Sequence, residues 1–160
     1  MNRTERAVQL FRDGYTCSQA IVAAFGPSYG VDAAVGVRLA EGFGGGIAGT
    51  GGICSAITGA TMVLGLRYGR TQPEDPAATE RTNALIRDFE RRFQAQCGSL
   101  YCQDLLGCRI DTPAKREMAR QRGLFGAICP RVVRAAAEIL EELLAAEQPA
   151  AVSATAVANA

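Results

Sequence analysis

The hydrophobic positions of this chain follow a helical rather than an alternating pattern. Segments with apolar residues on one face, such as residues 4–13, are separated by polar or glycine-rich breaks. No run alternates with a period of two for long enough to form a convincing strand. The pattern therefore predicts an all-α, single-domain bundle of about seven helices.

Capping signals mark where several of these helices begin. Residues 16–19 form a capping box, Thr-Cys-Ser-Gln, ahead of an apolar run. Elsewhere a polar residue with a capping side chain precedes the predicted helix at four places: Asp32, Asp75, Ser99 and Thr112. We expect the last helix to begin at Cys129-Pro130, because proline is favoured in the first helical turn.

One predicted helix, over residues 53–66, is apolar or small on every face. A helix of this kind belongs inside a domain, so we expect the bundle to form around it. Its small residues would let neighbouring helices pack closely: Ala56, Gly59, Ala60 and Gly65. The preceding segment, residues 42–52, is too rich in glycine for regular structure and predicts a loop.

The length of 160 residues suits one domain with a sizeable core. We assign this domain to residues 1–147. Residues 148–160 are mostly small, carry no charge and lack periodicity, so they predict a disordered, alanine-rich tail.

Charge and composition narrow the expected partners. The 17 basic and 16 acidic residues are interleaved and give a net charge of +1, which argues against a nucleic-acid partner. The first 15 residues lack the apolar core of a signal peptide, and the apolar helix is too short to span a bilayer, so we expect a cytoplasmic protein without a membrane partner. A redox partner stays unidentified, and formation of a homo-oligomer stays open.

The residue types present make sulfur the leading candidate for any chemistry. The chain contains no histidine, which excludes Ser-His-Asp and Cys-His catalysis and every histidine-ligated metal site. It contains six cysteines, and in the cytoplasm these are expected to be reduced, metal-bound or catalytic rather than structural disulfides.

Four of the cysteines fall where a helix is predicted to begin: Cys17, Cys54, Cys102 and Cys129. Unpaired backbone N–H groups and the helix dipole favour a thiolate at such a position. This placement favours a functional role over simple packing, although a free cysteine commonly packs as a small hydrophobic residue. For Cys97 and Cys108 we expect packing or incidental exposure.

The cysteine spacing matches no local cofactor motif, because no Cys-x-x-Cys is present. A shared site would have to be assembled by the fold. The four thiolates would then ligate an iron–sulfur cluster or another soft metal for electron transfer. Alternatively they would cycle between dithiol and disulfide without metal. A non-catalytic helical binding or structural protein, with cysteines as packing residues, is the third hypothesis.

The glycine loop has its own expected role beside Cys54. Its backbone N–H groups would hydrogen-bond a sulfur or a small anion, and the residues assigned to this cofactor-binding role are Gly44, Gly45, Gly46 and Gly52. Four arginines at helical spacing are better explained as solvated faces than as an anion site: Arg87, Arg91, Arg131 and Arg134.

The chain also resembles a known family over roughly residues 7–144. The matching segments are residues 14–20 (GYTCSQA), 42–46, 52–59 (GICSAITG), 64–69, 102–107 and 129–130. In this combination and order they resemble the C_GCAxxG_C_C family, whose members are described as redox-active. One departure is that the central motif is matched only as Gly52-x-Cys54-x-Ala56-x-x-Gly59. The resemblance implies that Cys17, Cys54, Cys102 and Cys129 are the signature cysteines.

Overall fold

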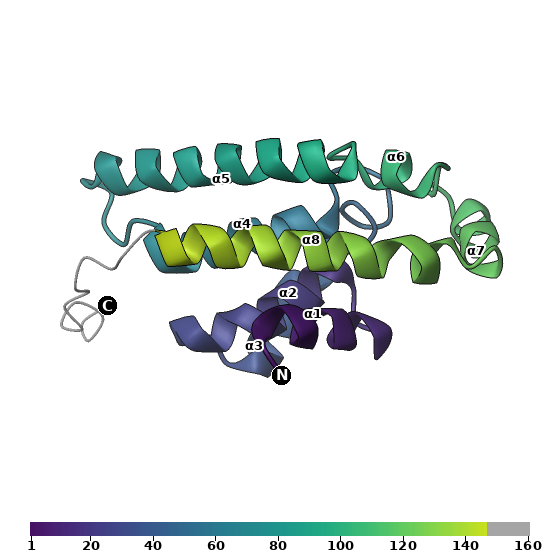
Figure 1. Cartoon of the computed structure of the whole chain (residues 1–160), viewed down its shortest axis with the longest axis horizontal. Helices are drawn as coiled ribbons and strands as arrows, with labels where there is room; N and C mark the ends of the chain where they lie inside the picture. Colours follow the sequence, from purple (N-terminus) through teal and green to yellow (C-terminus); the bar gives the residue numbers. More distant parts are fainter. Residues whose placement is uncertain (147–160) are drawn as a thin grey trace.

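The computed structural model describes residues 1–146, which form eight α-helices and two short 3₁₀ helices (Figure 1). In chain order these are α1 (Arg3–Arg12), α2 (Cys17–Phe25), η1 (Gly26–Tyr29), α3 (Ala33–Ala40), η2 (Glu41–Phe43), α4 (Ser55–Tyr68), α5 (Pro76–Cys97), α6 (Cys102–Leu106), α7 (Pro113–Gln121) and α8 (Leu124–Ala146). This part of the chain contains no β-strand, so the predicted all-α fold is confirmed. The tail predicted at 148–160 lies outside the described residues.

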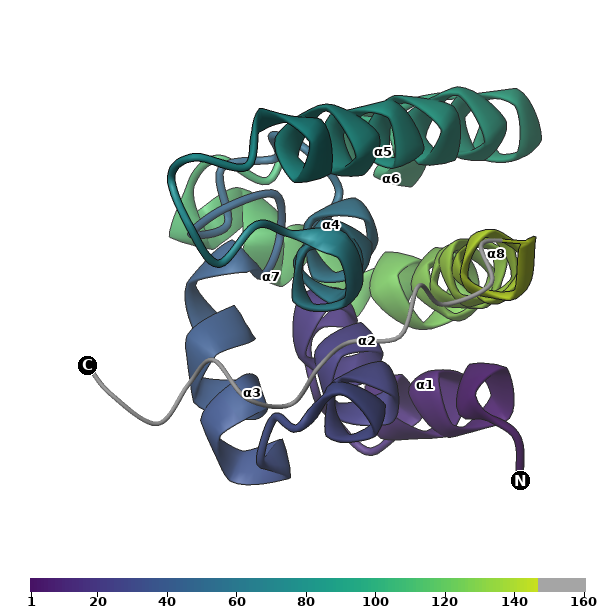
Figure 2. The same ribbon diagram turned by 90° about the vertical axis from the view of Figure 1, so that its left-hand side faces the viewer.

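The helices surround α4, as the apolar sequence of this helix predicted. Helix α5 lies on one side, α1, α2 and α3 lie on the other, and α4 and α8 run between them (Figures 1 and 2). Helix α4 contacts α2, α5 and α8. One face of its last turn is open to solvent, since Leu66 is 42% exposed while Tyr68 stays buried. No helix within residues 1–146 has the length and apolar composition needed to cross a bilayer.

Local capping sets most of the helix starts. The capping box at the start of α2 is present, and Asp32, Asp75 and Thr112 each cap the helix that follows them. Helix α6 differs from the prediction, because its N-cap is Tyr101 rather than Ser99. The Ser99 hydroxyl instead accepts a hydrogen bond from the Tyr101 N–H at 3.0 Å and donates one to the Asp104 carboxylate at 2.8 Å.

The start of α8 corrects the prediction for Cys129. The helix begins at Leu124, directly after Gly123, whose φ of 68° ends the preceding turn. Pro130 therefore lies inside the helix rather than in its first turn. Proline has no N–H to donate to the carbonyl four residues earlier, so this turn gives up one backbone hydrogen bond. Cys129 consequently has no free helix N-terminus beside it.

Gly59 permits the close crossing of α2 and α4. A Cβ built at Gly59 would lie 3.0 Å from the Ser18 carbonyl oxygen and 3.1 Å from the Cβ of Ile21. The Ser18 carbonyl belongs to the α2 backbone and cannot move away as a flexible side chain would. Gly65 differs from its predicted role, because a Cβ there would meet no atom within 4 Å.

We expect Gly59→Ala to lower the free energy of unfolding by about 1–3 kcal/mol, because the added methyl group overpacks the α2–α4 contact. Gly65→Ala is the matched control on the same helix. It is expected to leave stability unchanged or raise it by up to about 1 kcal/mol, because alanine has the higher helix propensity. Urea unfolding followed by circular dichroism measures both variants. Equal effects of the two substitutions would contradict the close crossing at Gly59.

Candidate functional site

Four cysteines from four different helices line one cavity of about 610 Å³. Cys17 is the first residue of α2, Cys54 is the N-cap of α4, and Cys102 is the first residue of α6. Cys129 reaches the same cavity from the second turn of α8. Each of these residues is at most 8% exposed. The fold therefore brings together the four cysteines that the sequence singled out, although only three of them lie at a helix start.

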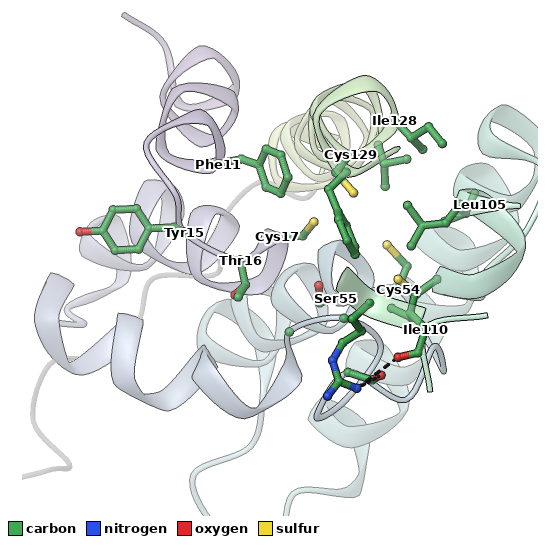
Figure 3. A pocket seen from close by; sticks show the side chains of 18 of the residues that line it. Phe11, Tyr15, Thr16, Cys17, Cys54, Ser55, Leu105, Ile110, Ile128 and Cys129 are labelled. Carbon is green, nitrogen blue, oxygen red and sulfur yellow. Dashed lines mark hydrogen bonds between the residues drawn. The ribbon is translucent and has the colours of Figure 1, made fainter. Parts of the chain in front are cut away.

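Cys17 and Cys129 form a pair of thiols within the cavity. Their side chains point toward one another from α2 and α8 (Figure 3). Interaction with the Cys129 side chain is the largest cause of a pKa of Cys17 that lies well above its ordinary value, followed by burial. The Ser55 hydroxyl, which also faces Cys17, lowers this pKa in part. Cys17 is thus a protonated thiol at neutral pH, with a second sulfur as its partner.

Backbone hydrogen bonds fix Cys54 and Cys102 next to each other. An isolated antiparallel β-bridge joins Ile53 to Tyr101. Through it the Cys54 N–H donates to the Leu100 carbonyl at 2.8 Å, and the Cys102 N–H donates to the Gly52 carbonyl at 2.7 Å. The starts of α4 and α6 are therefore held together independently of their side chains. Because this pairing engages the backbone N–H groups of Cys54 and Cys102, those two groups are already hydrogen-bonded to carbonyls.

The pKa directions at these cysteines correct the prediction that helix starts favour thiolates. Burial raises the pKa of Cys54 well above its ordinary value, and Cys17 raises it further. The N–H groups of Ala56 and Ile57 lower the pKa of Cys54 without offsetting that increase. Burial also raises the pKa of Cys102 to about 12. Desolvation of the charged form thus outweighs the helix dipole in this largely apolar cavity.

The glycine loop forms part of the cavity wall. Gly44 and Gly45 line the cavity, as do Ala48 and Gly49, whereas the described cavity lining does not include Gly46 or Gly52. Gly46 and Gly52 instead pack backbone to backbone, and a Cβ on Gly46 would lie 2.4 Å from the Gly52 nitrogen. Ile47 and Ala48 adopt positive φ values of 64° and 52°, which are unusual for residues with a side chain. Strain of this kind concentrates at functional sites.

The cavity is open to solvent, because several of its lining residues are exposed, among them Glu41, Ala48 and Arg120. Most of its wall is apolar, with Phe11, Ile110 and Ile128 among the lining residues (Figure 3). Tyr15, which is 38% exposed, lies at its edge. The lining residues also include the charged side chains of Glu41, Arg116 and Arg120. A small molecule therefore has a route from solvent to the buried thiols.

Sequence reasoning did not single out Arg116, which lines the cavity and contacts the glycine loop. Its Nη1 donates hydrogen bonds to the carbonyls of Gly49 and Ile110, both at 3.1 Å. The arginines considered from helical spacing lie elsewhere: Arg87, Arg91 and Arg134 form surface ion pairs, and Arg131 is exposed. Only the fold, which seats α7 against the glycine loop, identifies Arg116.

The remaining two cysteines lie outside the main cavity. Cys97 ends α5 and lines a second cavity of about 570 Å³, and Cys108 follows α6 beside Cys102. Both are partly buried, and all six cysteines are free thiols. Among residues 1–146, no group of three or more cysteine or acidic side chains is arranged to hold a single metal ion.

The described part of the chain is thus an all-helical domain in which four free thiols line one cavity. The chain belongs to the C_GCAxxG_C_C family, whose sequence pattern matches residues 15–143. The family is described as "Putative redox-active protein (C_GCAxxG_C_C)". The predicted family resemblance is thereby confirmed. A comparison with curated proteins found no match, and neither did a comparison with solved structures.

Proposed function

We propose that this protein is a two-electron thiol redox protein that reduces small disulfides in the cavity, with Cys17 and Cys129 as its dithiol–disulfide couple. The observation that carries the proposal is the direct pairing of these two thiols inside a cavity that solvent reaches. Two thiols that face one another from neighbouring helices can form a disulfide with little rearrangement, whereas distant ones require backbone movement.

The reaction proceeds by two thiol–disulfide exchanges. The Cys17 thiolate, formed by loss of its proton, attacks one sulfur of the substrate disulfide and releases the first substrate thiolate, which takes up that proton. The Cys129 thiolate then attacks the Cys17 sulfur of the mixed disulfide and releases the second substrate thiolate, which is protonated in turn. One substrate disulfide is thereby reduced to two thiols, and the protein dithiol is oxidised to a disulfide.

Cys17 is assigned the first attack because its surroundings contain groups that stabilise a thiolate. The Ser55 side chain and the backbone N–H of Cys17 both lower its pKa relative to burial alone. Cys129 lies within α8, where backbone N–H groups are used by the helix. Because the pKa of Cys17 is raised overall, we expect the rate to increase with pH through neutrality.

Turnover of a neutral disulfide tests the proposal. We expect the full chain to catalyse reduction of bis(hydroxyethyl) disulfide by dithiothreitol, faster than the uncatalysed exchange. The double variant Cys97→Ser/Cys108→Ser is the control, since it keeps all four cavity cysteines, and it is expected to retain the activity. Activity that disappears in this control and persists without Cys17 would contradict the assignment.

An iron–sulfur cluster is a second candidate, and it is favoured by the convergence of all four thiols on one cavity. Four cysteine thiolates are the usual ligand set of such clusters. A cluster suits this site better than a single metal ion, because residues 1–146 contain no group of three ligands arranged around one ion. The residues that would hold it are Cys17, Cys54, Cys102 and Cys129, and the cluster would supply one-electron transfer. Anaerobic reconstitution with iron and sulfide would give a visible charge-transfer band that Cys54→Ser abolishes.

A further inference from the structure

We propose that Arg116 makes the cavity selective for disulfides that carry an anionic group, such as a carboxylate. This inference rests on the proposed disulfide reduction and specifies its substrate class. The cavity places one half-buried guanidinium in a largely apolar wall that also carries the four thiols.

The Arg116 side chain is held in place without an acidic partner. Its Nη1 is bound by the carbonyls of Gly49 and Ile110, which leaves the Nη2 and Nε N–H groups for a ligand. The acidic residues nearest in sequence are engaged elsewhere: Asp111 pairs with Lys115 at 2.8 Å, and Glu117 pairs with Arg120 at 2.6 Å. Within residues 1–146, none of the ion pairs includes Arg116. The positive charge is therefore fixed in position and uncompensated.

The other charged side chains of the cavity wall are engaged by groups other than Arg116. Arg120 forms an exposed ion pair with Glu117. Glu41 keeps its negative charge and accepts a hydrogen bond from the Gln19 amide of α2, whereas Arg116 is held by the carbonyls of Gly49 and Ile110. A guanidinium in partly desolvated surroundings binds a carboxylate more strongly than one in water, because the effective dielectric is lower.

The glycine loop supports this arrangement. Gly49 has a φ of 71°, and a Cβ there would lie 3.0 Å from Arg116 Nη1, so the arginine packs directly on the loop backbone. Gly45 lines the same wall, and its N–H donates to no backbone carbonyl among the residues described. Backbone N–H groups of such loops commonly assist anion binding.

Three disulfides that differ mainly in charge test the inference. They are dithiodipropionate, which is anionic, bis(hydroxyethyl) disulfide, which is neutral, and cystamine, which is cationic. We expect the wild-type kcat/KM to be highest for the anionic compound and lowest for the cationic one. In Arg116→Gln, the ratio of anionic to neutral kcat/KM should fall about tenfold, as expected for loss of one charged hydrogen bond. Arg116→Lys should retain part of the preference.

The matched control is Arg122→Gln, an exposed arginine just after α7 that does not line the cavity. It removes the same charge and is expected to leave the ratio unchanged. Equal wild-type rates for the three disulfides, or a ratio that Arg116→Gln leaves unaltered, would overturn the role of Arg116. Failure to reduce even the neutral disulfide would instead overturn the proposed function, so the two failures are distinct.

Discussion

Cys129→Ser is expected to accumulate a stable mixed disulfide on Cys17, whereas Cys17→Ser accumulates none. The serine hydroxyl at position 129 cannot complete the second exchange, so the substrate half remains attached to Cys17 after the first attack. Both single variants should lose catalytic turnover down to the rate of the uncatalysed exchange. Intact mass spectrometry of each variant after incubation with bis(hydroxyethyl) disulfide measures the adduct, and peptide mapping locates it.

Two results would count against this division of roles. A mixed disulfide on Cys129 in the Cys17→Ser variant would reverse the order of attack. Full turnover in both variants would show that another pair carries the reaction, and Cys54 with Cys102 would then be examined first, because the bridge between Ile53 and Tyr101 holds them close. Cys97→Ser, outside the main cavity, serves as the variant that keeps wild-type turnover.

Cys102 in the metal-free folded protein should react with iodoacetamide about a thousandfold more slowly at neutral pH than in the unfolded chain. Its pKa rises from an ordinary value of 9.0 to about 12, and each pKa unit reduces the thiolate fraction about tenfold. The chief physical cause is burial, and the thiols of Cys17 and Cys108 contribute further. Rates measured by peptide mass spectrometry, with and without denaturant, give the comparison.

The pH profile separates this effect from simple blocking of access. A thiol with its pKa held near 12 gains reactivity about tenfold per pH unit through pH 9 and beyond, without levelling off there. The unfolded chain is the internal control and should level off near pH 9. A folded profile that also levels off near 9 would mean that Cys102 is shielded sterically and that its pKa is ordinary.

Local signals in the sequence were sufficient for most of the fold. The Thr16 and Asp75 side chains cap helices where the sequence placed them, because capping depends on residues within one turn. The local signal at Cys129-Pro130 gave a wrong helix start. Proline is common in a first helical turn, but α8 begins six residues before Pro130. That extension depends on packing that no local pattern encodes.

The four cysteines of the candidate site were predictable from the sequence, and the electrostatics of the site were not. The four cysteines could be singled out from helix starts and from the family resemblance, and they do line one cavity. The direction of their pKa shifts depends on burial and on distances between sulfurs, which follow only from the fold. Arg116 gave no signal in the sequence, since its place in the cavity wall arises from contact between α7 and a loop 67 residues earlier.

A redox titration with residue-level detection tests most directly whether Cys17 and Cys129 act as one two-electron couple. The full chain is equilibrated in dithiothreitol buffers of graded potential, alkylated, and mapped by peptide mass spectrometry. We predict that Cys17 and Cys129 lose reactivity together along a single two-electron curve, with a disulfide-linked peptide joining them. Oxidation of Cys129 with another cysteine while Cys17 stays reduced, or a one-electron curve that tracks bound iron, would contradict the account.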